Sequence, residues 1–272
     1  LTDAVENKYV QPMDLSQTQN DITAEVAYLI VDQKQVNVFY RLDSDKYEKL
    51  YADPDVRSAD GNRPESCSYH STGFDAENGE LRCLSIDFVD NDVPDKLRIA
   101  LRVNPNMVVE EVAPEHSVDD LYSSDDVYEE PSYLAEFEFL LEFDPKFTAA
   151  GKFFPVNQTV ILEGQAITIT DIEVYPTHMR VDIEESPDNT AWMKGLEFYI
   201  ETDWGMKFDA ASSGIISTGS ADSPSMVSYR ADSSYFYEAD HLKLVITGAQ
   251  WLRKDMETTY LNLVTGEHGE LP

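Results

Sequence analysis

The chain has 272 residues, of which 20 are basic and 52 are acidic, and its formal net charge is −32. Hydrophobic residues make up 42% of it, which predicts packed cores and argues against wholesale disorder. The negative field repels phosphate backbones and anionic lipid, so nucleic-acid binding and direct membrane docking are not expected. The charge indicates a strongly hydrated surface or, alternatively, the capture of cations or of a basic partner.

Apolar and polar residues alternate with a period of two along most of the chain, which predicts half-buried β-strands. In the first such strand, Ile22, Ala24, Val26, Tyr28 and Ile30 share one face. Many short strands separated by turn residues, with few helix signals, predict an all-β protein of two tandem immunoglobulin-like β-sandwiches. Further strands are expected within residues 36–42, 84–88, 97–103, 135–143, 160–162, 167–174, 179–183, 196–200, 242–246 and 261–263.

One strand–turn–strand pattern occurs twice, in residues 22–42 and 167–183. The first strands align at an offset of 145 residues and the second strands at 143, which makes the turn of the second copy two residues shorter. At Asp171 the alternation slips, so that Ile172 and Val174 take the inward face, and this slip predicts a β-bulge. The repeat indicates two domains, and small residues near 150 suit a connector, which places them at 1–150 and 151–272.

The chain contains two cysteines, Cys67 and Cys83. An even pair is compatible with one disulfide in an oxidising compartment, and we expect that bridge to tie an incoming loop to the strand that begins near Leu81. The alternative is a pair of buried free thiols.

Two acidic segments are candidates for binding. Oxygen-bearing side chains crowd the end of a predicted strand and resemble a calcium loop, but they lack the glycine and the distal glutamate of an EF-hand. Residues 110–130 hold nine acidic residues and no basic ones, which is typical of a solvated loop excursion, with a ligand-binding role as the alternative. The first cluster comprises Asp87, Asp90, Asn91, Asp92 and Asp95.

Motifs of catalysis are missing from the sequence. The five histidines are scattered without zinc-ligand spacing, and neither a nucleophile elbow nor a phosphate-binding glycine pattern occurs. We therefore predict no catalytic residues, no cofactor and no metal site, and a protein that is not an enzyme. Trp192, Trp204 and Trp251 are candidates for stacking on sugars, although aromatic residues on strands more often belong to the core.

Several segments resemble a family of uncharacterised extracytoplasmic proteins of Firmicutes, some of which are described as anti-sigma-factor-like. The resemblance implies tandem β-modules, an upstream transmembrane helix and a link to sigma-factor signalling, and it supplies no catalytic residues. The resemblance rests on residues 155–160, 164–169, 174–177, 196–205, 235–236 and 242–251 for the C-terminal module, and on residues 21–42 for the N-terminal module.

These observations together predict a function and a location. The chain starts at Leu1 and contains no apolar stretch of about 20 residues, so we expect a soluble exterior fragment of a surface protein anchored by an upstream helix. The expected function is non-catalytic sensing or interaction with an unknown protein or glycan ligand. The alternative is a carbohydrate- or cell-wall-binding adhesion module. The first domain, which carries the cysteines and the acidic segments, is where we expect specific binding.

Overall fold

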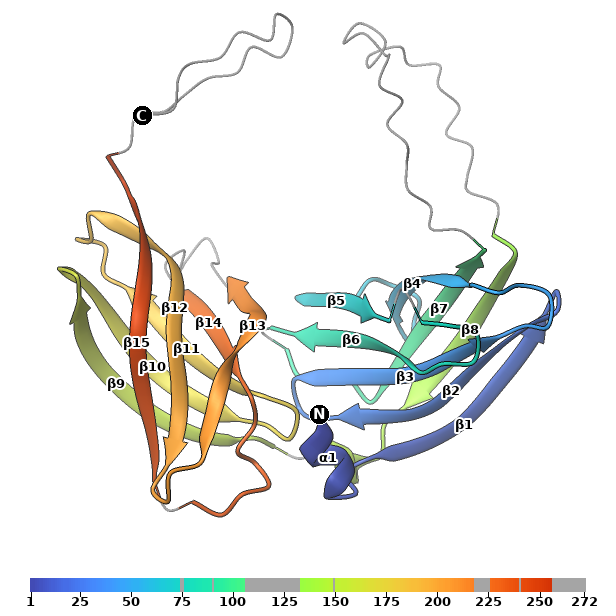
Figure 1. Ribbon diagram of the computed structural model, residues 1–272, viewed down its shortest axis with the longest axis horizontal. Coiled ribbons are helices and arrows are strands. Elements are labelled where there is room, and N and C mark those ends of the chain that lie inside the picture. Colours follow the sequence, from blue (N-terminus) through green and yellow to red (C-terminus); the bar gives the residue numbers. More distant parts are fainter. Residues whose placement is uncertain are drawn as a thin grey trace, which may run out of the picture.

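The computed structural model describes residues 1–73, 76–89, 91–105, 133–148, 150–217, 226–239 and 241–255, without the side chains of residues 212–217. Apart from helix α1 (Thr2–Glu6) and the 3-10 turn η2 (Pro145–Phe147), the described elements are antiparallel β-strands (Figure 1). The all-β prediction is confirmed. The acidic residues 110–130 lie outside the described residues, as do residues 261–263.

The N-terminal half, up to residue 150, contains two sheets. One has the strand order β1-β2-β3-β6-β5, and the other has the order β4-β7-β8. The strands are β1 (Gln11–Gln19), β2 (Ile22–Val31), β3 (Gln35–Asp43), β4 (Tyr51–Ser58), β5 (Cys67–Thr72), β6 (Arg82–Phe88), β7 (Lys96–Asn104) and β8 (Ala135–Glu142).

The C-terminal half, from residue 151, contains one sheet of order β15-β12-β13-β14-β11-β10-β9. Its two parts are joined because β12 pairs with β15 on one side and, at one end, with β13 on the other. Figure 1 shows this curved sheet beside the N-terminal half. The strands are β9 (Lys152–Leu162), β10 (Gln165–Val174), β11 (Met179–Glu185), β12 (Ala191–Thr202), β13 (Lys207–Ser217), β14 (Met226–Ala231) and β15 (Leu242–Arg253).

Both halves follow the strand order of an immunoglobulin-like sandwich. In that fold, strands A-B-E-D form one sheet and strands C-F-G form the other. Strands β2-β3-β6-β5 and β4-β7-β8 reproduce this order, with β1 added at the edge. Strands β10-β11-β14-β13 repeat A-B-E-D and β12-β15 repeat C-F, with β9 added at the edge and no strand in the place of G among the described residues.

The repeated pattern has one constant offset in the structure. Adding 143 to β2 gives the bounds of β10, and the inner pairs Val31–Val36 and Val174–Met179 both enclose turns of four residues. The predicted shortening of the second turn is therefore wrong. The edge hairpins agree too, because Asn20 and Glu163 both take positive φ angles, of 52° in each case.

The first strand of each repeated hairpin contains a β-bulge. The register of β10 shifts between Ile169 and Asp171, as predicted, and the register of β2 shifts between Val26 and Tyr28, which was not predicted. The bulge in β2 turns Leu29 toward the core and leaves Tyr28 on the outer face, where its ring stacks on Phe39 with centroids 4.5 Å apart. The two bulges lie at equivalent places, 143 residues apart, so they leave the offset constant. A displacement of two residues preserves the alternation of apolar residues along a strand, which is why matching similar residues gave an offset of 145 for the first strands.

Each half buries its own cluster of apolar side chains. The cluster of the N-terminal half contains Tyr40 and Phe137 at 2% and 1% exposure, and that of the C-terminal half contains Ile200 and Phe208 at 0% and 3%. The predicted boundary at residue 150 lies between the two clusters and stays a prediction.

The predicted disulfide between Cys67 and Cys83 is contradicted. Both are free cysteines on the neighbouring strands β5 and β6, where Cys67 is opposite Phe88 and Cys83 is opposite Thr72. Five residues of strand between the two pairs correspond to about 17 Å, whereas a disulfide needs Cα atoms within about 7 Å. Burial raises the pKa of both thiols, which favours the unreactive protonated form.

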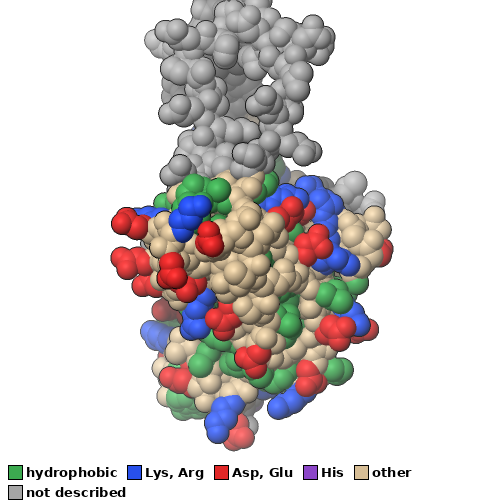
Figure 2. Space-filling model, turned by 90° about the vertical axis from the view of Figure 1, so that its right-hand side faces the viewer, with side chains coloured by type: hydrophobic (Ala, Val, Ile, Leu, Met, Phe, Trp, Pro, Cys, Tyr) green, Lys and Arg blue, Asp and Glu red, His purple; other side chains and the backbone are tan. Residues whose placement is uncertain are grey.

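On the outer face of the N-terminal half, acidic, basic and hydrophobic side chains are scattered among uncharged polar side chains and backbone (Figure 2). Three ion pairs cross from β7 to β8 on exposed positions, and each is expected to contribute under about 1 kcal/mol. These pairs are Lys96–Glu142, Arg98–Glu138 and Arg102–Glu136.

Candidate functional site

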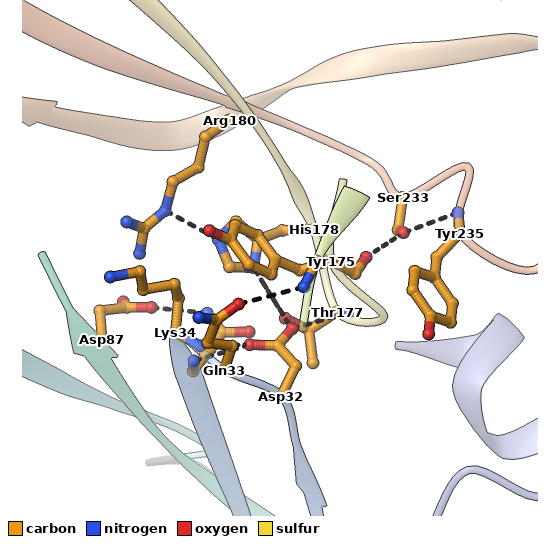
Figure 3. Close-up of polar contacts among 12 residues, drawn as sticks. Asp32, Gln33, Lys34, Asp87, Tyr175, Thr177, His178, Arg180, Ser233 and Tyr235 are labelled. Carbon is orange, nitrogen blue, oxygen red and sulfur yellow. Dashed lines mark hydrogen bonds and ion pairs between the residues drawn. The ribbon is translucent and has the colours of Figure 1, made fainter. Parts of the chain in front are cut away.

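The turns of the two repeated hairpins meet at the contact between the halves (Figure 3). Asp32, in the β2–β3 turn, is fully buried. Its Oδ1 accepts the backbone N–H groups of Lys34 and Gln35 at 2.9 and 2.8 Å. Its Oδ2 accepts the backbone N–H of Thr177, in the β10–β11 turn, at 3.0 Å, and also the Thr177 hydroxyl. One carboxylate therefore organises its own turn and binds the turn of the other half.

Burial raises the pKa of the Asp32 carboxyl, and the hydrogen bonds from Thr177, Lys34 and Gln35 oppose that rise. A buried carboxylate is costly unless donors surround it. Four donors from two parts of the chain supply that surrounding, so the cost of burying Asp32 is offset only when the halves are together.

His178 continues the chain of hydrogen bonds behind Thr177. Arg180 Nε donates to His178 Nε2 at 3.1 Å, and His178 Nδ1 lies 2.7 Å from Thr177 Oγ1. Because Nε2 accepts, the proton of the neutral ring is assigned to Nδ1, which donates to Thr177. Burial, together with the charges of Arg230 and Arg180, holds the pKa of His178 well below 6.5. The ring is therefore neutral and relays the contact from Arg180 to Asp32.

Two arginines reach from the C-terminal half into the N-terminal half. Arg180 on β11 and Arg230 on β14 are cross-strand partners. Arg180 donates to the carbonyl oxygens of Phe88 and Val89 at 2.8 and 3.3 Å. Arg230 Nη2 lies 2.5 Å from Asp87 Oδ1, with both side chains at least nine-tenths buried. These two arginines attach the C-terminal half to a carboxylate and two carbonyl groups of the N-terminal half.

A network of polar side chains on β3 and β6 receives these arginines. Asp87 accepts from Gln35 Nε2 at 2.7 Å, Asn37 donates to Gln35 at 2.9 Å, and Ser85 donates to Asn37 at 2.7 Å. All four side chains are buried, although they lie on the outer face of the sheet, opposite to Val36, Leu84 and the core. This burial requires polar neighbours from the other half.

A polar cleft of about 340 Å³ adjoins this network. Its walls come from β3, β5 and β6 of the N-terminal half and from the β10–β11 turn and β14 of the C-terminal half. The volume is in the range of small-molecule sites, which are usually more apolar than this one. The contact thus combines a hydrogen-bonded junction with an open polar cavity next to it. The junction is made by Asp32, Thr177, His178, Arg180, Arg230 and Asp87.

The segment between helix α1 and strand β1 makes a second contact with the C-terminal half, at the segment after β14. The Tyr9 ring lies against Phe236 of the C-terminal half with centroids 5.7 Å apart, and the Tyr9 hydroxyl is held within its own half, where it donates to the Phe147 carbonyl at 2.6 Å. Ser233 donates to the Tyr175 carbonyl, which supports the β10–β11 turn from behind.

The acidic cluster of the N-terminal half is divided by the structure. Asp87 belongs to the junction, whereas Asp92 pairs with Lys34 at 2.9 Å and accepts from Gln33. Asp90 lies outside the described residues. In the described part of the chain, no three His, Cys, Asp or Glu side chains are grouped so that they could hold a metal ion. Asp87 and Asp92 are thus committed to protein partners, and nothing groups them with Asp95 as ligands of calcium.

Sequence reasoning missed the residues of the junction. Thr177 was noted only within the family resemblance, and Asp32, His178, Arg180 and Arg230 carried no motif. One signal was available, because Asp32 follows an apolar strand directly, in a turn where a carboxylate can accept backbone N–H groups. Burial also raises the pKa of Asp182, with further increases from Asp171 and Glu173, but this group lies outside the junction.

Comparisons with known proteins agree with the fold and leave the function open. Residues 151–267, less than half of the chain, match the model of DUF5643, a family of unknown function. The structure is similar to one described as the crystal structure of the conserved domain protein from Bacillus anthracis, at a TM-score of 0.55 and 12% identity, over 91% of this chain and 92% of that one. No curated protein matches the chain. Within the described residues, no helix is long and apolar enough to cross a membrane.

The stability contributed by His178 is expected to depend on pH. Below pH 6.5 the unfolded chain binds a proton at this imidazole and the folded chain does not, so unfolding takes up a proton and acid favours it. The stability advantage of the wild type over His178→Gln should shrink by about 1 kcal/mol for each pH unit below 6.5. Urea unfolding of both proteins between pH 5 and 7.5 measures this difference. The contributions of the other titrating groups cancel, because both proteins contain them. A difference that does not change with pH contradicts the assignment.

Proposed function

We propose that the chain is a non-catalytic sensor or interaction module of a membrane-anchored surface protein, with a link to sigma-factor signalling. The observation that carries the proposal is the buried polar junction beside an open cleft, between two halves with separate cores. A contact held by directional polar bonds is broken as a unit when its geometry changes. A ligand in the cleft, or cleavage of the exterior part, therefore alters how the halves hold each other.

The family resemblance of both modules, including residues 174–177 of the β10–β11 turn, supports the exterior location and the sigma-factor link. The same turn supplies Thr177 to the junction, so the resemblance and the junction concern the same part of the chain.

The test is made in the full-length protein at the cell surface. Thr177→Val removes the hydroxyl that donates to Asp32 and keeps the shape of the side chain. Thr159→Val is the matched control, because Thr159 is exposed and its hydroxyl, among the described residues, bonds to that of Thr168. Transcription that depends on a sigma factor encoded nearby should change with Thr177→Val and not with Thr159→Val, at equal surface amounts. Equal transcription in all three proteins overturns the signalling proposal.

One observation favours the alternative, an adhesion module that binds carbohydrate or cell wall. Trp192 and Trp204 are 50% and 55% exposed, and exposed rings can stack on sugars. Trp192 lies near the start of β12 and Trp204 lies in the turn after its end at Thr202, with about 30 Å of strand between them, so they would act as separate contacts and not as one platform. Binding to a glycan array that is lost in Trp192→Ala or Trp204→Ala supports adhesion.

A further inference from the structure

We propose that the cleft between the halves binds a neutral, hydroxyl-rich ligand of the size of a mono- or disaccharide. This inference rests on the proposed function, since it names the ligand class of the same site. Two observations support the inference: the arrangement of polar side chains around the cleft, and the presence among them of groups with no hydrogen-bond partner in the described part of the chain.

The wall of the N-terminal half is a small grid of polar side chains. Asp87 is the cross-strand partner of Gln35 on one side and of Ser68 on the other. In the next row, Ser85 lies between Asn37 and His70 in the same way. Rows and columns of a sheet are about 5–7 Å apart, so a flat ligand on this face meets several groups that donate and accept hydrogen bonds.

The wall of the C-terminal half contributes a donor without an acceptor. Arg230 lines the cleft, its side chain is 10% exposed, and its Nε–H is buried with no hydrogen-bond partner among the described residues. Opposite it, Asp87 uses Oδ1 for both Gln35 and Arg230, and its Oδ2 accepts no bond from the described part of the chain. Buried polar groups in native proteins are nearly always paired, so the unpaired Oδ2 of Asp87 at the wall of the cleft points to a ligand or to water, whereas the Nε–H of Arg230 has no accessible surface from which to reach one.

The chemistry of the cleft disfavours anionic and hydrophobic ligands. The charge of Arg230 is matched by Asp87, so no surplus cation attracts an anion, and the net charge of −32 repels one. Apolar lining is limited to small side chains such as Ala231, apart from Leu1 at the rim, which suits no hydrophobic ligand. The lining, which mixes acceptors such as Asp87 and Asp232 with donors such as Arg230 and Ser68, suits a neutral molecule with closely spaced groups that both donate and accept, as the hydroxyls of a sugar do.

A ligand held in this way contacts both halves at once. It would bond to Asp87, Asn37 or His70 on one side and to Arg230 on the other. Such binding stabilises the closed contact between the halves by mass action, because separated halves offer only part of the site. Ligand binding in the cleft therefore also stabilises the hydrogen bonds of the junction.

The experiment is isothermal titration calorimetry of the whole chain with cellobiose, with N,N′-diacetylchitobiose and with inorganic phosphate. Ser68→Tyr places a large side chain at the exposed rim of the cleft, and Thr72→Tyr places the same side chain on the same face of β5, outside the lining residues. We expect at least one disaccharide to bind at millimolar Kd or tighter, at least tenfold weaker binding to Ser68→Tyr, and binding within twofold of wild type for Thr72→Tyr. Arg230→Lys, which keeps the charge beside Asp87, should weaken binding at least fivefold.

Three results overturn the inference: neither disaccharide binds the wild type, Ser68→Tyr and Thr72→Tyr bind alike, or phosphate binds in the cleft instead. The thermal midpoint of each variant shows whether it is folded. Ser68→Tyr and Thr72→Tyr replace exposed residues, so the test does not depend on a substitution in a buried site. Disaccharide binding without any effect of Thr177→Val on transcription overturns the sensor proposal alone. An effect of Thr177→Val on transcription without disaccharide binding overturns the ligand class alone.

Discussion

Replacement of Asp32 by alanine is expected to lower the free energy of unfolding by about 3–5 kcal/mol, the loss typical of removing one member of a buried, hydrogen-bonded polar pair. The substitution leaves the N–H groups of Lys34, Gln35 and Thr177 and the hydroxyl of Thr177 without their acceptor. Each unpaired buried donor costs about 1–3 kcal/mol, and some relax toward water when the carboxylate is gone. Urea unfolding measures the loss.

Asp92→Ala is the matched control for Asp32→Ala. Asp92 also accepts hydrogen bonds and pairs with Lys34, but its side chain is 58% exposed. An exposed ion pair of this kind contributes under about 1 kcal/mol. If Asp32→Ala and Asp92→Ala destabilise the protein equally, the buried carboxylate does not organise the contact between the halves.

Replacement of Arg180 by methionine is expected to cost about 3 kcal/mol and to loosen the halves. Methionine keeps most of the apolar stem but removes the donors to the carbonyls of Phe88 and Val89 and to His178 Nε2. Hydrogen bonds from a charged donor contribute about 1.5–3 kcal/mol each, and the loss is partly offset because the guanidinium no longer has to be desolvated. Urea unfolding measures the cost. Hydrogen exchange measures the loosening, because the Thr177 amide loses protection when its acceptor Asp32 withdraws.

Arg98→Met is the matched control on the surface. Arg98 pairs with Glu138 at 3.1 Å, with side chains 41% and 59% exposed, and its removal should cost about 0.5 kcal/mol or less. Protection of the Thr177 amide should be unchanged in Arg98→Met. Equal protection of this amide in Arg180→Met and the wild type would show that Arg180 does not hold the halves together.

The strands could be predicted from the sequence because their apolar residues alternate locally. Val36, Val38, Tyr40 and Leu42 are buried in the core, as the period of two requires. The bulge near Asp171 left a visible slip of phase, whereas the bulge near Ala27 did not, because apolar residues occupy both faces of β2 there. Tyr28 and Ile30 were assigned to the inner face for that reason. Ile30 is nonetheless fully buried, on the side of the sheet opposite to Leu29.

The cysteines show the limit of reasoning from composition. An even number of cysteines favoured a bridge, but pairing depends on where two strands stand in register. Cys67 and Cys83 lie on adjacent strands but are offset by five positions, because the register of β5 and β6 places Cys67 opposite Phe88 and Cys83 opposite Thr72. Nothing in the spacing of the two residues indicates that register.

The sequence by itself determined the all-β character of this protein and the repetition of its hairpin, since both follow from the order of apolar and polar residues along a strand. Only the tertiary structure decided that the two repeated turns touch and that Asp32, Thr177, His178 and Arg180 form one buried chain of hydrogen bonds. The reason is physical. Residues 145 positions apart acquire a common environment only after both sheets have folded, and polar side chains in turns look solvent-exposed until another surface buries them.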